Sequence, residues 1–150
     1  MGNPTLRELE QSLPLALLKA REATMVRFRP MLKKHGLTEQ QWRVIRVLAA
    51  DQPLDASALA ERTFLLAPSV SRILTTLQDR GLIERSADRS DQRRSVLRLS
   101  ATGEQRFRDV APDSEALYAQ IEVQIGSDDM ARLYELLARF TSVLEDSEVA

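Results

Sequence analysis

The chain has 150 residues, of which 43% are hydrophobic and 29% are charged, proportions that indicate a folded protein rather than a disordered one. It has no cysteine, which excludes disulfides, thiolate metal sites and sensing by thiol oxidation. The net charge is −1, yet residues 1–54 and 55–100 are both net positive, while residues 101–150 hold four arginines against eleven acids. Such a division orients a protein on a polyanion, although it is also compatible with an ordinary mixed surface.

The length favours a single domain with a substantial hydrophobic core. No apolar stretch approaches the ~18–20 residues that a membrane span requires, so no membrane partner is expected. Residues 1–5 lack the charged and then apolar pattern of a signal peptide. We therefore expect a cytoplasmic protein.

Two helices are predicted in the first third of the chain. The first runs from about Leu13 to Lys34, and Pro30 is expected to kink or end it, because proline lacks the amide hydrogen that the helix needs. The second begins after Thr38, which forms a capping box with Gln41.

An arginine lies among apolar residues on one face of the first helix. Arg21, Met25 and Phe28 are spaced i, i+4 and i+7 and therefore share that face. The guanidinium of Arg21 can form a structural or intersubunit salt bridge, or it can bind a ligand carboxylate through two parallel hydrogen bonds. On the second helix, Trp42 is either a core residue or a wall of the same ligand site, and Arg46 is a second candidate for binding the carboxylate.

The next segment is predicted to form a helix, a tight turn and another helix. Asp55 caps the first of these helices, which runs from Ala56 to Arg62. Ala60 lies ten residues before Val70, and this spacing resembles a helix-turn-helix, in which a small residue lets the two helices cross closely. Phe64 occupies the position at which such a turn usually has glycine.

The second helix of the pair is predicted from Pro68 to Arg80, with Ala67 as its N-cap. Its apolar face has helical spacing: Val70, Ile73, Leu74 and Leu77. The opposite face carries small hydroxyl side chains and one arginine: Ser69, Ser71, Arg72, Thr75 and Thr76. A helix that is buried on one side and carries short side chains on the other suits the DNA major groove, because bulky side chains would block the approach to base edges.

A two-stranded hairpin follows, with the returning strand at 95–100 and a charged loop at 87–94. The loop holds two aspartates and three arginines: Asp88, Arg89, Asp91, Arg93 and Arg94. The Asp-x-Arg spacing predicts that Asp91 holds Arg93 rigid through a short ion pair. A rigid arginine on a narrow ribbon can enter a minor groove, where the negative potential is strongest at A·T tracts. The alternative is a solvated turn.

The last third is predicted to be two helices. Ser100 caps the first, from Thr102 to about Gln124, Pro112 bends it, and Gly126 separates it from the second.

The terminal helices carry more apolar residues than one small domain can cover. We therefore interpret residues 5–30 and 105–146 as the interface of an intertwined homodimer, with an intramolecular core as the alternative.

Several of these stretches resemble a known family. Asp91-Gln92-Arg93, followed by Val96 to Ser100 and by Thr102-Gly103, is similar to the wing signature of the MarR family of winged-helix regulators. The match in length, element order and spacing extends over nearly the whole chain. Residues 17–23 and 37–43 resemble the subgroup that regulates homoprotocatechuate (4-hydroxyphenylacetate) degradation operons.

The resemblance implies a mainly α fold with a small β-hairpin wing, in one domain of residues 1–150. The winged helix-turn-helix lobe would lie at about 37–100, and dimerisation helices at about 5–34 and 102–146. It also implies an intertwined homodimer that binds a pseudo-palindromic operator in double-stranded DNA. Its function would be transcriptional repression that a small aromatic (phenolic) carboxylate relieves.

The resemblance also implies roles for individual residues. Arg93 would enter the minor groove with Asp91 orienting it, and Arg89 and Arg94 would contact phosphates. The effector would bind between the dimer helices and the DNA-binding lobe, against residues of the first two helices: Arg21, Met25, Phe28, Trp42 and Arg46.

Other functions are open to the sequence. An enzyme is not expected, because the five glycines are scattered at element ends and no His-Glu-x-x-His or Cys/His pair occurs. His35 is the only histidine and is interpreted as a solvated cap residue, so neither a metal nor a cofactor is expected. A winged helix that contacts proteins, and a DNA-binding protein without an effector, are the two alternatives.

Overall fold

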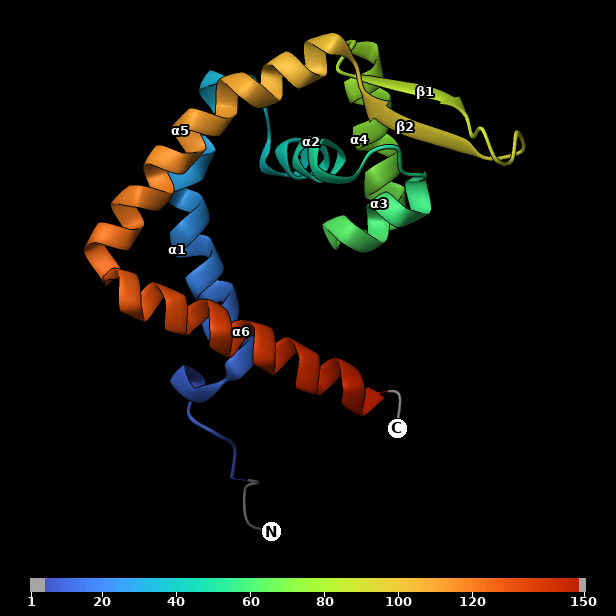
Figure 1. Ribbon diagram of the computed structural model, residues 1–150. Helices are drawn as coiled ribbons and strands as arrows, with labels where there is room; N and C mark the ends of the chain where they lie inside the picture. The colour runs from blue at the N-terminus through green and yellow to red at the C-terminus, as the bar shows by residue number, and fades with distance from the viewer. Residues whose placement is uncertain (1–4, 149–150) are drawn as a thin grey trace. The chain divides into compact units, whose positions relative to one another are not determined.

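The computed structural model describes residues 5–148, which form a mainly α fold with one β-hairpin (Figure 1). The elements in chain order are the 3₁₀ turn η1 (Leu9–Gln11), α1 (Leu13–Lys34), α2 (Glu39–Asp51), α3 (Ala56–Thr63), α4 (Ala67–Asp79), β1 (Ile83–Ala87), β2 (Ser95–Leu99), α5 (Ala101–Ile125) and α6 (Ser127–Glu148). The predicted fold class is confirmed. Four of the five residues inspected for a signal peptide, residues 1–4, lie outside the described part of the chain.

The chain divides into two compact units, residues 1–113 and 114–150. The boundary follows Asp113, the residue after Pro112, and Pro112 lies inside α5. Hydrogen bonding does not stop at this proline, and α5 is a single helix of 25 residues. Among residues 5–148, no helix combines the length and apolarity that a membrane crossing requires.

The core of the first unit is built by the inward faces of α1 to α5 and of the hairpin. Its most deeply buried side chains are Leu32, Val44, Ile45, Leu48, Leu59, Val70, Leu74, Leu77, Leu82, Leu97 and Val110. The three predicted stripe residues Val70, Leu74 and Leu77 are each at most 1% exposed, whereas Ile73 is half-buried. This burial fixes α4 by one face and leaves the opposite face in solvent.

Local capping explains where the helices begin. The predicted capping box of α2 is confirmed, because Thr38 Oγ1 accepts from the Gln41 amide at 3.1 Å and Gln41 Oε1 accepts from the Thr38 amide at 3.0 Å. Asp55 caps α3 by accepting from the Ala58 amide at 2.7 Å. Ser100 caps α5 in the same way. Each cap satisfies a backbone donor that the first helical turn leaves unpaired.

The predicted bounds of the first helix, Leu13 to Lys34, are confirmed, and Pro30 lies inside α1 without ending it. Met31 and Leu32 beyond Pro30 are buried, and their packing outweighs one lost hydrogen bond. Other predicted bounds differ by one residue: α3 ends at Thr63 rather than Arg62, α4 ends at Asp79 rather than Arg80, and α5 begins at Ala101 rather than Thr102. Helix α4 begins at Ala67 rather than Pro68, so its N-cap is Leu66, which makes no side-chain capping bond. Proline is tolerated throughout the first helical turn, so its position does not fix the helix start to one residue.

The turn between α3 and α4 has a left-handed residue. Phe64 has φ 56° and ψ 32°, the conformation in which glycine is favoured. Its side chain is 86% exposed. The structure therefore confirms that Phe64 occupies the turn position usually held by glycine.

The hairpin projects from the helices α2–α4 (Figure 1). Its antiparallel register pairs Ile83 with Leu99 and Ala87 with Ser95. The base of the hairpin is buried through Val96, Leu97 and Leu99, while the loop residues 89–94 are exposed. The wing is therefore anchored at its base and free at its tip.

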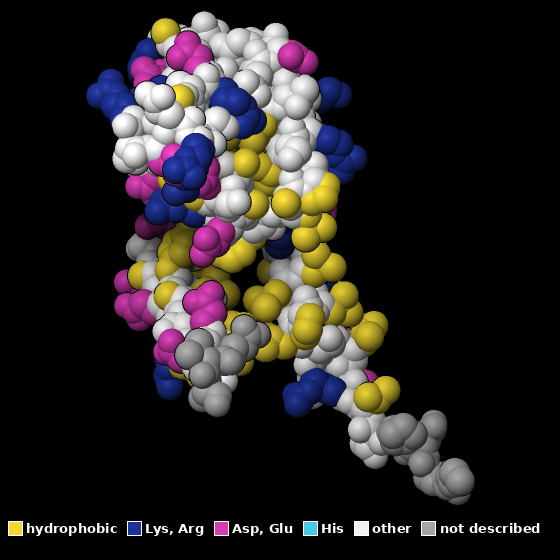
Figure 2. All heavy atoms as spheres, turned by 90° about the vertical axis from the view of Figure 1, so that its right-hand side faces the viewer, with side chains coloured by type: hydrophobic (Ala, Val, Ile, Leu, Met, Phe, Trp, Pro, Cys, Tyr) yellow, Lys and Arg dark blue, Asp and Glu magenta, His cyan; other side chains and the backbone are white. Residues whose placement is uncertain are grey.

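Large apolar side chains remain exposed near both ends of the described chain. In and before α1 they are Leu6, Leu9, Leu13, Leu15, Leu17, Leu18 and Val26. On α5 and α6 they are Tyr118, Val123, Ile125, Leu133, Tyr134, Leu136, Leu137, Val143 and Leu144. Figure 2 shows such hydrophobic side chains, in yellow, gathered at the surface rather than scattered. Apolar surface on this scale fits the predicted homodimer interface, since a monomer rarely leaves so much of it in water.

We predict that Gly103→Ala destabilises the protein. A Cβ at position 103 would lie 1.9 Å from the backbone oxygen of Leu82, so the start of α5 would have to move away from the turn it packs on. Overpacking of this kind costs about 1–3 kcal/mol, more than alanine contributes to a helix. Urea denaturation at fixed protein concentration measures the loss. Thr102→Ala, at the exposed neighbouring position, should leave stability within about 0.5 kcal/mol of the wild type.

Candidate functional site

The exposed face of α4 carries the predicted DNA-reading residues. Ser71, Arg72, Thr75 and Thr76 are exposed, and Ser69 is half-buried. They come together on one surface because the opposite face of the same helix is locked into the core. The geometry that the sequence predicted for this helix is therefore present.

Two hydroxyl groups on this face donate hydrogen bonds to backbone carbonyls of α4. Thr75 Oγ1 donates to the Ser71 carbonyl at 3.0 Å, and Thr76 Oγ1 donates to the Arg72 carbonyl at 3.1 Å. Each oxygen keeps its lone pairs, so each threonine can accept a hydrogen bond from a base amino group. The other side chains of this face that carry hydrogen-bond donors are Ser69, Ser71 and Arg72.

The loop of the wing presents Arg93 to solvent. Its side chain is 96% exposed, and its Nε lies 3.9 Å from Asp91 Oδ1. Asp91 and Arg93 therefore form the predicted ion pair, although 3.9 Å is too long for a hydrogen bond. Asp91 Oδ1 also accepts from the backbone amide of Arg93 at 3.1 Å, and the Asp91 carbonyl accepts from the Arg94 amide at 3.0 Å. Asp91 thus shapes the loop backbone, which aims Arg93 without immobilising its guanidinium.

The other two loop arginines are placed differently. Arg89 is exposed at the loop. Arg94 forms an ion pair with Asp55, the residue that caps α3. This pair ties the wing to the start of the helix-turn-helix. Beside them, the Ser90 amide and hydroxyl donate to Asp88, and these bonds lower the pKa of its carboxyl group.

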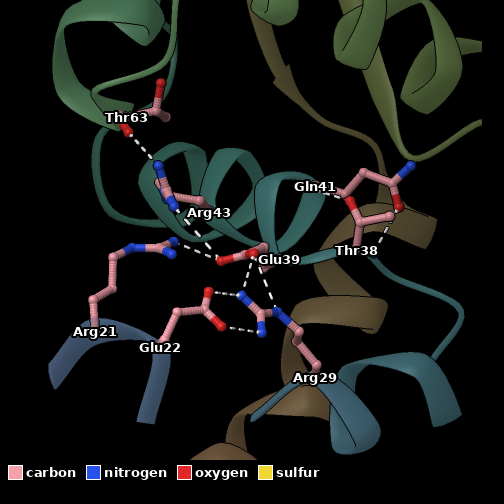
Figure 3. A network of polar contacts seen from close by, with 8 residues as sticks. All are labelled: Arg21, Glu22, Arg29, Thr38, Glu39, Gln41, Arg43 and Thr63. Carbon is pink, nitrogen blue, oxygen red and sulfur yellow. Dashed lines mark hydrogen bonds and ion pairs between the residues drawn. The ribbon is translucent and has the colours of Figure 1, made fainter. Parts of the chain in front are cut away.

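A carboxylate shared by arginines joins α1 to α2 (Figure 3). Glu39, the first residue of α2, accepts from Arg21 at 2.6 Å and from Arg29 at 3.1 and 3.2 Å. Arg29 also binds Glu22 through two hydrogen bonds of 2.6 and 2.9 Å. Burial alone would raise the pKa of Glu39, but the hydrogen bonds from Arg21 and Arg29 outweigh it and lower the pKa. The carboxylate is therefore ionised at neutral pH.

The same network reaches the helix-turn-helix. Arg43 Nη2 lies 4.0 Å from Glu39, and Arg43 Nη1 donates to the Thr63 carbonyl at 3.0 Å (Figure 3). Thr63 is the last residue of α3 and directly precedes the left-handed Phe64. Contacts therefore run without a break from α1, through the start of α2, to the turn that positions α4.

The five predicted effector residues differ in their surroundings. Arg21 is bound to Glu39, which matches the salt-bridge interpretation of this residue. Phe28 and Trp42 are buried and Met25 is half-buried. Arg46 lines an open cavity of about 560 Å³ together with Arg43, Val47, Ala49, Ala50, Asp51, Arg62 and Phe107. Trp42 stacks on Phe107, a residue that lines this cavity, at a centroid distance of 5.7 Å.

Sequence reasoning missed Glu39, Arg29 and Arg43 as members of a network. Glu39 showed only the ordinary preference of an acid for a helix N-terminus, and its partners on α1 lie 18 and 10 residues away. His35 is the C-cap of α1, as predicted, but it is not simply solvated, because its Nε2 lies 2.7 Å from Asp113 Oδ2. Within residues 5–148, no three or more His, Cys, Asp or Glu side chains are placed to hold a metal ion.

A helix-turn-helix with a polar face on its second helix, followed by an arginine-tipped hairpin, defines a winged-helix DNA-binding protein. Comparison with known proteins specifies the class further. The MarR family model matches residues 35–94. The homoprotocatechuate degradative operon repressor of Escherichia coli is 40% identical over 135 residues, which cover 90% of this chain and 91% of the repressor. The chain belongs to the MarR family of transcriptional regulators.

Solved structures agree with this assignment. The transcriptional regulator PA4135 has 41% identity and a TM-score of 0.83, over 88% of this chain and 97% of that chain. NadR in complex with 4-hydroxyphenylacetate has 38% identity and a TM-score of 0.78, over 91% of this chain and 96% of that chain.

We predict that Arg93→Ala weakens operator binding and reduces its salt dependence while leaving the fold intact. The side chain is almost fully exposed, so its loss removes a cation from the DNA interface without disturbing the core. The slope of log K against log salt should fall by about one for each wing. Fluorescence anisotropy at several salt concentrations measures the slope. Arg108→Ala, an exposed arginine on α5, serves as the control, and an unchanged slope in Arg93→Ala would exclude the wing from the interface.

Proposed function

We propose that this protein is a dimeric, sequence-specific DNA-binding repressor that acts in the cytoplasm and releases its operator when a small aromatic carboxylate binds. The observation that carries the proposal is the exposed polar face of α4, held by the buried side chains of Val70, Leu74 and Leu77 in a chain 40% identical to an operon repressor. Catalysis plays no part in this function.

The DNA-binding surface consists of α4 and the wing. Helix α4 enters the major groove with Ser69, Ser71, Arg72, Thr75 and Thr76. Arg93 enters the flanking minor groove, and Asp91 keeps the loop in shape. Arg89 contacts a phosphate. Arg94 can contact a phosphate only if its guanidinium binds Asp55 and the phosphate together, or if its ion pair with Asp55 breaks.

The dimer forms through the terminal helices. Their exposed leucines and valines supply the apolar surface that a second copy would cover. Two copies related by a two-fold axis would place their α4 helices in successive major grooves about 34 Å apart, which explains a pseudo-palindromic operator.

The effector class rests on two supports. One is the likeness to NadR, whose structure holds 4-hydroxyphenylacetate, and to the homoprotocatechuate operon repressor. The other is the presence of Arg21 and Arg46, either of which suits a carboxylate, near the aromatic side chains of Phe28 and Trp42 along α1 and α2. In the proposed dimer, the second subunit would complete a site between the dimer helices and the DNA-binding lobe.

A mobility shift on the DNA upstream of the protein's own gene tests the proposal. Binding should depend on base sequence and on salt, and 4-hydroxyphenylacetate or a related phenolic acid should reverse it. Specific binding that no acid reverses would leave an effector-independent regulator. Binding without sequence preference would favour a winged helix that contacts proteins.

The variant Arg21→Ala should separate operator binding from the release of the operator by the acid. DNA binding should remain near that of the wild type, because Arg21 lies on α1, outside the helix-turn-helix and the wing. Release of the operator by the acid should weaken strongly, because the acid would lose its charged contact with Arg21. The coupling free energy between ligand and operator, which is typically ~1–3 kcal/mol, should fall accordingly. Operator affinity with and without saturating acid gives the coupling. Arg27→Ala, on the same helix, is the matched control; if Arg21→Ala responds as well as Arg27→Ala does, the carboxylate binds elsewhere.

A further inference from the structure

The N-terminal end of α4 is apolar and exposed. Leu66, the N-cap, is 77% exposed, and Ala67 and Pro68 after it are exposed as well. Leu66 makes no side-chain capping bond, although N-caps usually supply one. Leu66 therefore occupies the position where a capping serine or aspartate would be expected, and two more apolar residues follow it.

This apolar end continues the surface assigned to DNA. Pro68 precedes Ser71, Arg72 and Thr75 by three, four and seven residues and so lies on their face of the helix. In helix-turn-helix proteins the first residues of the recognition helix are those that contact base edges. Leu66 and Ala67 therefore extend the same surface at the end that penetrates the groove most deeply.

The major groove offers one apolar group to such a surface. Guanine, cytosine and adenine present only hydrogen-bonding groups there, whereas thymine also presents its 5-methyl group. An exposed leucine at this place cannot satisfy a donor or an acceptor. It gains free energy only by covering apolar surface, and in the major groove that surface is a thymine methyl.

We infer that Leu66, flanked by Ala67 and Pro68, recognises a thymine in each operator half-site by contact with its 5-methyl group. The inference rests on the proposed function and extends it, because it names a base, and the group on that base, that a side chain before the polar face of α4 would contact. The operator should therefore contain a thymine at which uracil is a poor substitute.

Replacement of thymine by uracil removes only the methyl group and keeps every hydrogen-bonding group. The operator is first defined by footprinting, and each thymine of one half-site is then replaced singly by uracil. At one position the wild type should bind about fourfold more weakly, the loss that corresponds to one methyl group returned to water. If no thymine shows a loss, the inference is overturned, whereas the absence of any footprint would overturn the proposed function instead.

Protein variants assign the methyl contact to Leu66. Leu66→Ala should bind the thymine and uracil operators with equal affinity, and Leu66→Met, which keeps an apolar side chain of similar volume, should restore the preference for thymine. Phe64→Ala is the matched control, since Phe64 is another exposed apolar side chain of the same turn, two residues before Leu66. It should keep the fourfold preference.

Two outcomes would overturn the assignment. The first is a Leu66→Ala variant that still prefers thymine by the same factor as the wild type. The second is a Phe64→Ala variant that loses the preference to the same extent. Because Leu66 is mostly exposed, circular dichroism and the melting temperature should be unchanged in Leu66→Ala, so an effect on binding can be separated from unfolding.

Discussion

The carboxylate of Glu39 is the interaction on which the arrangement of α1 and the helix-turn-helix depends. It stands at the start of α2 and is held by Arg21 and Arg29 from α1. Removing a partner would leave a partly buried anion less compensated, so the cations and the carboxylate hold one another in place. Arg43 extends the same set of contacts to the last carbonyl of α3.

This chain of contacts gives a ligand a physical route to the DNA-binding helix. A carboxylate bound to Arg21, as proposed, would place a second anion beside Glu39, a change that the loss of Arg21 alone does not make. Glu39 and Arg43 share α2, and Arg43 holds the Thr63 carbonyl beside the left-handed Phe64. A shift of Arg43 would therefore act on the residue pair that sets the angle between α3 and α4. A small change of that angle in each subunit is enough to spoil the spacing of two recognition helices on an operator.

The features predictable from the sequence are those that local chemistry determines. The caps at Thr38, Asp55 and Ser100 act over three residues, so their spacing located the starts of α2 and α3 and placed that of α5 within one residue. The buried stripe of α4 likewise follows from helical periodicity. Asp91 pairs with the Arg93 guanidinium as the spacing predicts, but it also accepts from the Arg93 amide, a bond that the sequence analysis did not predict.

The candidate site was less predictable because its contacts join distant segments. Nothing near Glu39 in the sequence indicates that Arg21 will bind it, since that pairing exists only after α1 has packed on α2. The pair of Arg94 with Asp55 has the same origin. The five predicted effector residues were chosen by face and by resemblance, but whether they surround one cavity depends on the packing of whole helices.

Operator and aromatic acid compete through the protein, and thermodynamic linkage makes this competition measurable from either side. Calorimetric titration of the acid into the free dimer and into the dimer saturated with operator gives two dissociation constants. Their ratio should equal the factor by which the acid weakens operator binding, because a coupling free energy is reciprocal. Equal affinity of the acid for the free and the DNA-bound dimer would contradict the account, since a ligand that does not distinguish the two states cannot release the DNA.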